Sequence, residues 1–239
     1  VRNFLKLNRK APGRIILDVD ATDNRLYGNQ EGRFFHGYYR HYCYLPLYIF
    51  SEDHLLAARE RRSNIDGAAG TKEELERIVK QIRTEWPKVN IIVRGDSGFA
   101  RDNIMTWCEE NSVDYLFGLA QNNRLRESIS AELEQAQREC EATEEPVRIF
   151  KDFKYQTLDS WSKERRVIGK AEWLPQGSNP RFIVTSLSRR AVKAMQLYEQ
   201  HYCARGDMEN RIKEQLQLFS DRASSHTMQG NQLRMWFSA

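Results

Sequence analysis

The sequence predicts an α/β fold, a mixed five-stranded sheet flanked by helices, with a β-rich insertion before a long last helix. Short apolar, β-branched segments at 14–20, 89–93 and 113–119 indicate buried strands. Helical stripes of apolar residues lie between the later strands, and this alternation implies parallel pairing in that half. The aromatic-rich segments 33–39 and 42–50 complete the five strands, and we expect them to form an antiparallel meander with 14–20.

Local signals bound the individual elements. Pro46 places its strand at an edge or at a bulge, because proline lacks the N–H that a strand ladder needs. Thr71 and Glu74 form a capping box at the start of a helix, and Pro87 marks where that helix stops. A second helix is predicted over 101–111, with one apolar side.

The alternation of helix and strand breaks after residue 120. A polar helix pattern covers 124–141, and strand signals follow over 151–171 and 180–185. We therefore predict an insertion over 121–188 with its own helix and a small antiparallel sheet. Residues 191–219 then carry the pattern of one long helix.

These elements divide the chain into three predicted segments. Residues 1–120 form the first part of the core, 121–188 the insertion, and 189–239 complete the core with the last helix. The first residue is Val1 rather than Met, so we expect a trimmed or processed chain or a piece of a longer protein. Its C-terminal part is expected to be truncated.

Composition excludes some classes of protein. A net charge of +4 and a pI of about 8.8 permit nucleic acid as a partner without arguing for it. No apolar run approaches the roughly 18 residues of a membrane helix, so no membrane partner is expected. The four cysteines form no Cys-x-x-Cys pair, which argues against a zinc or redox motif. Without a signal-peptide pattern, reduced thiols and a cytoplasmic location follow.

Three carboxylates stand at informative places. Asp20 ends the first buried strand, Asp96 ends the fourth, and Glu209 lies in the last helix. Ligands bind at strand ends in α/β sheets, and three convergent carboxylates suit magnesium or manganese. Each also has a simpler interpretation. The two aspartates are equally suited to stabilise turns, and Glu209 to pair with Lys213 one helical turn on.

The last helix carries a second pattern. Tyr202, Arg205, Glu209 and Lys213 recur at spacings of three or four, which places them along one face with Ile212 and Leu216. A carboxylate between two cations suits a metal site that faces a phosphate backbone. A surface ladder of ion pairs explains the same pattern.

These residues resemble a known family. Tyr202-x-x-Arg205-x-x-x-Glu209 resembles the signature around the catalytic glutamate of bacterial insertion-sequence transposases. Asp20-Ala21-Thr22 resembles the first catalytic position, and 94–99 (Arg-Gly-Asp-Ser-Gly-Phe) the second. The segments 17–22, 27–32 and 202–213 are most similar to the branch called transposase DDE domain group 1. The resemblance extends over about residues 14–237.

The resemblance implies a fold, a chemistry and a site. The fold is RNase H-like, with a β-rich insertion between the second aspartate and the glutamate. The chemistry is metal-assisted hydrolysis at transposon ends, followed by attack of the freed 3′-hydroxyl on target DNA. Asp20, Asp96 and Glu209 would hold Mg²⁺, with Mn²⁺ as a substitute. Double-stranded DNA would be the partner of a homodimer in a bacterial, nucleoid-associated setting.

The sequence departs from the family pattern in two places. The signature usually ends with a lysine seven residues after the glutamate, where this chain has Leu216 and only Lys213 nearby. Asp18 competes for the first carboxylate position, because side chains alternate along a strand and Asp18 and Asp20 share a face. We favour Asp20 because Thr22 follows it.

Two tryptophans of the insertion have two interpretations. Trp161 and Trp173 fit either stacking on an unpaired base or, as we favour, the core of a small sheet.

Two rival functions stay open: another RNase H-like nuclease, and an inactive domesticated transposase fragment that acts as a DNA-binding module. The resemblance assigns DNA contacts to Tyr202 and Arg205. Positive charge adds further candidates for phosphate contacts: Arg211 and Lys213, then Arg25, Arg33, Arg94 and Arg101.

Overall fold

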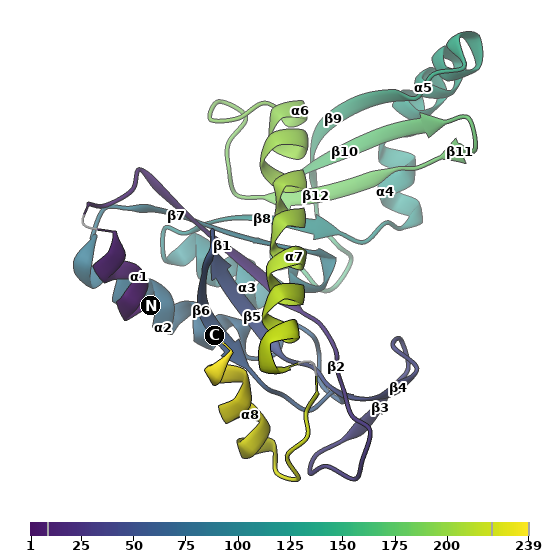
Figure 1. The fold of residues 1–239 in the computed structure, drawn as a ribbon. Coiled ribbons are helices and arrows are strands. Elements are labelled where there is room, and N and C mark those ends of the chain that lie inside the picture. The colour runs from purple at the N-terminus through teal and green to yellow at the C-terminus, as the bar shows by residue number, and fades with distance from the viewer. Residues whose placement is uncertain (9, 221, 239) are drawn as a thin grey trace. The chain divides into compact units, whose positions relative to one another are not determined.

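The computed structural model describes residues 1–8, 10–220 and 222–238 of the chain. By internal packing the chain divides into two compact units, whose elements are labelled in Figure 1. The first unit comprises Val1–Arg94 and Arg205–Ala239, and the second comprises Gly95–Ala204. The three segments predicted from the sequence, with boundaries after 120 and 188, remain a prediction.

The first unit is built on strands in the order β7-β1-β5-β6. β1 pairs antiparallel with β5, and β5 pairs antiparallel with β6, so the predicted meander exists. Leu17 and Val19 of β1 are fully buried, as the apolar run implies. The strands cover these ranges: β1 Arg14–Ala21, β5 Leu47–Ser51, β6 His54–Arg59 and β7 Asn90–Gly95.

The predicted membership of the meander is wrong in part. Segment 33–39 does not join β1, and 42–50 is two strands, separated around Pro46 because proline offers no N–H to a ladder. β6 was not predicted because its leucines and alanines favour helix. A separate three-stranded sheet, in the order β2-β4-β3, contains β2 Asn24–Arg25, β3 Phe34–His36 and β4 His41–Tyr44.

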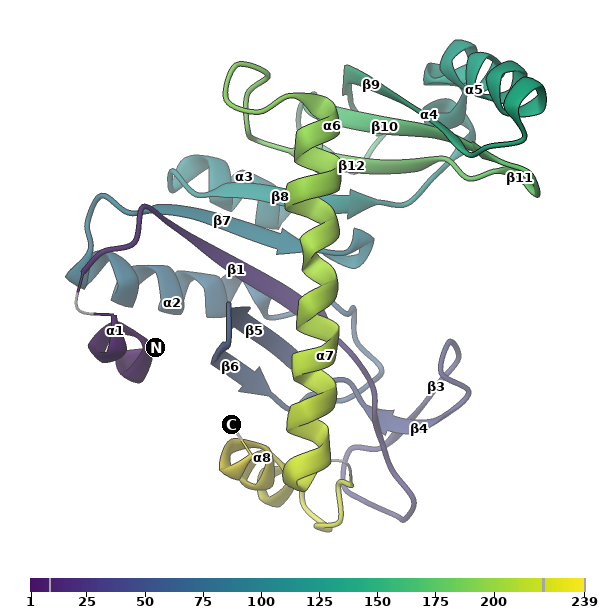
Figure 2. The same ribbon diagram turned by 45° about the horizontal axis from the view of Figure 1, so that its top comes forward.

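The helices of the first unit complete its core. Met208 and Ile212 of α7 and Met235 of α8 pack against Tyr48 and Phe50 of β5. Figure 2 shows α7 lying across β1 and β5. The helical elements are α1 Arg2–Leu7, α2 Thr71–Glu85, α7 Gly206–Gln215, η4 Leu216–Ser220 and α8 Met228–Phe237.

The start of α2 differs from the prediction. The helix ends before Pro87 as expected, but its N-cap is Gly70, at a φ of 77°, a conformation that favours glycine. Thr71 lies inside the first turn, and its Oγ1 has no hydrogen-bond partner among the described residues. The predicted capping box is therefore wrong. α1 and α8 were not predicted at all.

The second unit contains the strands in the order β11-β10-β12-β8, with β9 on the other edge of β10. β12 pairs antiparallel with β8, so the strands predicted as an insertion extend a core strand. The strands are β8 Asp114–Leu119, β9 Val147–Tyr155, β10 Arg165–Leu174, β11 Gly177–Ser178 and β12 Arg181–Thr185.

Helices of the second unit agree with the prediction except in detail. The predicted helix over 101–111 is α3, and the polar helix over 124–141 is interrupted at Ile129 into two. The helical elements are η1 Ser97–Phe99, α3 Asp102–Glu110, α4 Asn123–Ser128, α5 Ser130–Thr143, α6 Ala194–Gln196, η2 Leu197–Tyr202 and η3 Cys203–Arg205.

The predicted last helix begins at Ala194 rather than at residue 191, continues to Ser220, and changes its winding along the way. A π-helical turn spans Leu197–Tyr202, a 3₁₀ turn spans Cys203–Arg205, and a second π-helical stretch begins at Leu216. π-Turns inside helices are frequent at functional sites. Helices accompany the strands of both units as expected, so the predicted α/β fold class is confirmed. Among the described residues no helix has the length and apolar character to cross a bilayer.

Candidate functional site

The first predicted carboxylate position contains two aspartates in different environments. Asp18 is buried, and both of its oxygens accept hydrogen bonds from Arg94: Nε lies 2.5 Å from Oδ1 and Nη2 lies 2.7 Å from Oδ2. Asp20 is half-buried and stands opposite Tyr48 in the ladder between β1 and β5. Arg94 is thus committed to a structural ion pair, which removes it from the predicted DNA contacts.

The end of β1 meets the turn between β3 and β4. The Tyr39 side chain from that turn forms a hydrogen bond with Thr22, the third residue of the first motif. Burial, together with the charges of Asp23 and Asp20, raises the pKa of Tyr39 to about 12. Asp23 is engaged by His41, whose Nε2 lies 2.6 Å from its Oδ2. The neutral Tyr39 phenol therefore lies within the field of Asp20.

Asp96 follows directly on β7. It is the N-cap of η1, and its Oδ1 accepts a hydrogen bond of 2.8 Å from the N–H of Gly98. Asp96 therefore stabilises the turn, as its simpler interpretation predicted, but it does so with Oδ1 alone. The residue is partly exposed, so the carboxylate is accessible as well as oriented.

The second unit brings Asp96 together with one residue of the glutamate signature. A cavity of about 180 Å³ is lined by Asp96, Tyr202, Tyr198 and Arg181, together with neighbours from β8 and β12. The rings of Tyr198 and Tyr202 lie 5.7 Å apart. Motif positions separated by more than a hundred residues in the chain therefore line one cavity.

Gly118 makes this approach possible. A Cβ at Gly118 would lie 2.5 Å from the hydroxyl oxygen of Tyr202 and 2.9 Å from the backbone nitrogen of Ser97. Real carbon atoms do not tolerate such separations from neighbours, so only glycine lets both groups approach this point of β8. This role of Gly118 could not be predicted from the sequence, because an isolated glycine in a strand has several explanations.

The other signature residues belong to the first unit. The Arg205 guanidinium lies 3.5 Å from Glu209, whose side chain is 53% exposed. Lys213 is exposed, while Ile212 is buried in the core, so the predicted stripe is split between surface and interior. Arg211 forms an ion pair with Asp53.

The predicted metal ligands are distributed over both units. Asp20 and Glu209 belong to the first unit and Asp96 to the second. Within the described residues, no group of three or more histidine, cysteine, aspartate or glutamate side chains gathers in a way that would hold a metal ion. The ligand set Asp20, Asp96 and Glu209 therefore stays a prediction.

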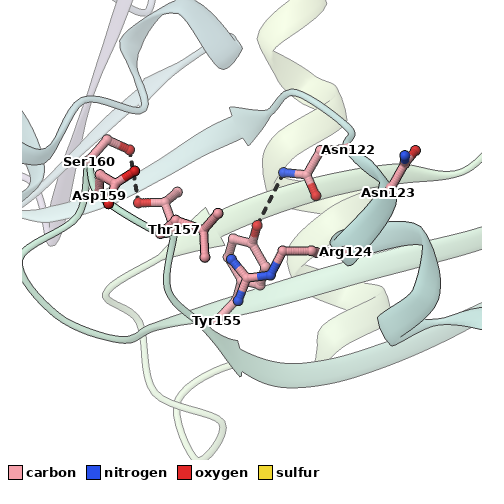
Figure 3. Close-up of a pocket in the computed structure, with 8 residues that line it drawn as sticks. Asn122, Asn123, Arg124, Tyr155, Thr157, Asp159 and Ser160 are labelled. Atoms are coloured by element: carbon pink, nitrogen blue, oxygen red, sulfur yellow. Dashed lines mark hydrogen bonds between the residues drawn. The ribbon is translucent and has the colours of Figure 1, made fainter.

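A further cavity of about 620 Å³ lies in the second unit (Figure 3). Arg124 lies over the ring of Tyr155 at 5.2 Å, and the Asn122 amide donates to the Tyr155 hydroxyl at 3.1 Å. Trp161 is buried edge-on against Tyr155 and beneath Arg165. The favoured core role is therefore the one that Trp161 has, and its ring is not available to stack on a base.

Comparison with known proteins places the chain in a family. The family model described as transposase DDE domain group 1 matches residues 1–239, which confirms the resemblance seen in the motifs. No curated protein matches the chain.

Two solved structures are similar at low identity. The piggyBac transposase in a synaptic complex with hairpin DNA aligns at 11% identity with a TM-score of 0.48, over 85% of this chain and 40% of that one. The catalytic domain of human Endonuclease V aligns at 13% identity with a TM-score of 0.32, over 89% of this chain and 95% of that one. The chain thus spans 40% of the length of the piggyBac transposase chain. By the family model, which covers its whole length, this chain belongs to the transposase DDE domain group 1 family.

Proposed function

We propose that this chain is the catalytic core of a bacterial insertion-sequence transposase, which hydrolyses phosphodiester bonds at transposon ends and transfers the freed strand to target DNA. The observation that carries the proposal is the family match over residues 1–239, together with the three carboxylate motifs in order. The substrates are double-stranded DNA ends and target DNA. The active complex contains a homodimer, in a bacterial cytoplasm where the protein associates with the nucleoid.

Asp20, Asp96 and Glu209 are the proposed ligands of Mg²⁺, for which Mn²⁺ substitutes. Carboxylate oxygens are the donors that these hard cations prefer. The partial exposure of Asp20 and Asp96 and the exposure of Glu209 fit this role. Asp18 does not fit it, because Arg94 occupies both of its oxygens. This difference supports Asp20 as the first ligand.

The bound ions would supply Lewis-acid activation of the attacking oxygen and charge stabilisation at the leaving oxygen. The protein's own groups orient the DNA. Arg205 and Lys213 flank Glu209 on the helix surface and offer positive charge to a phosphate. Tyr202 presents its hydroxyl in the cavity beside Asp96, where it is suited to hold a phosphate oxygen. Arg211 would contact DNA only after leaving Asp53.

The test is a cleavage and strand-transfer assay on duplex DNA that carries the transposon ends, with Mg²⁺ or Mn²⁺. We expect Asp20→Asn, Asp96→Asn and Glu209→Gln each to lower product formation by at least a hundredfold. Asp207→Asn is the matched control, because it removes an exposed carboxylate two residues from Glu209 and should leave activity unchanged.

Two outcomes would overturn the proposal. Cleavage without strand transfer by the wild-type chain would assign it to the RNase H-like nucleases. DNA binding without cleavage under either metal would identify an inactive DNA-binding module. Calorimetry with Mn²⁺ distinguishes a chain that cannot bind the metal from an active chain that was tested on DNA without its transposon ends. Wild type should bind the ion and Asp96→Asn should not.

A further inference from the structure

The small sheet of the first unit exposes an unusual number of aromatic rings. Tyr27, Phe35, Tyr38 and Tyr42 are 71%, 58%, 84% and 44% exposed, although large apolar surfaces are normally covered. All four lie between β2 and the end of β4. Figure 2 shows β3 and β4 as a hairpin extending from β1, β5 and β6.

Three of the side chains in this region form one contiguous cluster. Phe35 and Tyr42 are direct partners across β3 and β4, with ring centroids 5.7 Å apart and edge to face. The Arg33 guanidinium carbon lies over the Tyr42 ring, 4.6 Å from its centroid. We call Arg33, Phe35 and Tyr42 the hairpin cluster. Beside it in the sequence, Arg25 lies over the ring of Tyr27 at 5.1 Å.

The charge around the hairpin cluster favours a polyanion. Residues 24–44 contain three arginines, Arg25, Arg33 and Arg40, and a single acidic residue, Glu31. Asp23, one residue earlier, is paired with His41 of β4. Glu31 is engaged elsewhere, because its Oε2 accepts a hydrogen bond from the N–H of Met228. Guanidinium groups bind phosphate, and exposed aromatic rings offer flat surfaces to bases. An apolar protein partner would meet these arginines without a compensating acid.

The hairpin is also tied to the first carboxylate motif. Tyr39, the neighbour of Tyr38, forms a hydrogen bond with Thr22 and lies within the field of Asp20. Both belong to the first unit. The turn that joins β3 and β4 therefore lies close to the end of β1.

We propose that the hairpin cluster, together with the exposed Tyr38 of the turn that joins its two strands, is a stacking site for unpaired bases of a DNA strand. The inference rests on the proposed function for its location beside Asp20, and it names the form of DNA that this surface takes. A duplex buries the faces of its bases, so exposed rings gain stacking only from unpaired nucleotides. The arginines hold the backbone of the same strand.

The test is fluorescence anisotropy with a labelled twelve-nucleotide oligo-dT and a blunt duplex of the same length, both in EDTA. We expect Phe35→Ala, Tyr42→Ala and Tyr38→Ala each to raise the Kd for oligo-dT about tenfold. The Kd for the duplex should rise less than threefold. Arg33→Ala should weaken both and reduce the salt dependence by about one ion.

Matched controls remove equivalent groups elsewhere in the first unit. Phe237→Ala deletes a ring that is 73% exposed on α8, and Lys88→Ala deletes an exposed cation. Neither should alter the preference for single strands. Because Tyr38 is 84% exposed, its replacement should leave the fold intact, and circular dichroism checks this.

Three results would overturn the proposal. An unchanged Kd for oligo-dT in all three ring variants would exclude stacking. Equal losses of affinity for the duplex and for the single strand would show that the cluster contacts only phosphates. A dimer in sedimentation velocity that the ring variants dissociate would assign the surface to a second copy of the chain. Binding in EDTA needs no cleavage. If the chain prefers oligo-dT through these rings but fails the cleavage assay, the proposed function is wrong and the stacking site stands.

Discussion

At Gly118, the addition of a single Cβ atom is expected to destabilise the fold. Gly118→Ala places a carbon 2.5 Å from the Tyr202 hydroxyl oxygen, so the ring or β8 must shift. We expect a loss of about 1–3 kcal/mol in the free energy of unfolding. Tyr202→Phe removes the oxygen, and the double variant should therefore lose less than the sum of the two single variants. Gly13→Ala, with nothing within 4 Å, is the control. Strict additivity in urea unfolding would contradict this account.

Glu60 sets a pH dependence of stability. It is buried in the first unit, where its Oε2 accepts a 3.5 Å hydrogen bond from Asn24, and its Oε1 has no partner among the described residues. Burial raises the pKa of Glu60 from 4.5 to about 8. A raised pKa contributes stability that is complete below pH 4.5 and is lost as pH rises through about 8.

The free energy of unfolding should therefore fall by a few kcal/mol between pH 5 and pH 9. Glu60→Gln keeps the shape without the titration and should flatten that slope. Urea unfolding at the two pH values measures it. Equal slopes in the variant and the wild type would show that Glu60 is solvated in the native state.

The choice between Asp18 and Asp20 shows what residue patterns leave open. Alternation along the strand gives both side chains the same face, so spacing cannot separate them. The difference lies in Arg94, which is 76 positions away in sequence from Asp18 and pairs with both of its oxygens. Such a long-range pairing has no local signature. The motif residue Thr22 favoured Asp20 from the sequence, and the occupied state of Asp18 supports the same ligand.

At the scale of elements, α3 and β10 are joined by one buried arginine. The Arg165 side chain is 1% exposed, and its nitrogens lie 2.6 Å from Asp102 and 2.9 Å from Glu109. Arg165→Met leaves Asp102 without its cation and leaves Glu109 only the exposed Lys163, 2.9 Å away. We expect a loss of about 3–5 kcal/mol in the free energy of unfolding. The control is Arg189→Met, whose 63% exposed side chain pairs with Asp152 and should cost at most about 1 kcal/mol. Similar losses in both variants would refute the buried-network argument.

Elements were predictable where a local pattern decides them. The buried strands β1, β7 and β8 and the helices α2 and α3 follow from apolar periodicity alone. β6 was missed because its leucines and alanines favour helix and only pairing with β5 makes it a strand. The β2-β4-β3 sheet was misassigned for a related reason, since its partners are chosen by register rather than by composition.

At the scale of the molecule, the proposed metal ligands are drawn from both units. Order along the chain predicted the α/β class, but not the division at 94/95 and 204/205, which depends on contacts such as the pairing of β12 with β8. If the ligands are Asp20, Asp96 and Glu209, ion binding should stabilise the native state, and loss of any one of them should weaken that effect. An ion that binds only the native state stabilises it by about 2.7 kcal/mol at a hundredfold excess over Kd.

We therefore expect Mn²⁺ at millimolar concentration to raise the melting temperature of the wild-type chain by several degrees, and EDTA to reverse the rise. Asp96→Asn in the second unit and Glu209→Gln in the first should each abolish the shift, because loss of either ligand weakens the same ion. Asp207→Asn should keep it. A shift that survives Asp96→Asn but not Glu209→Gln would place the ion in the first unit alone and remove Asp96 from the ligand set.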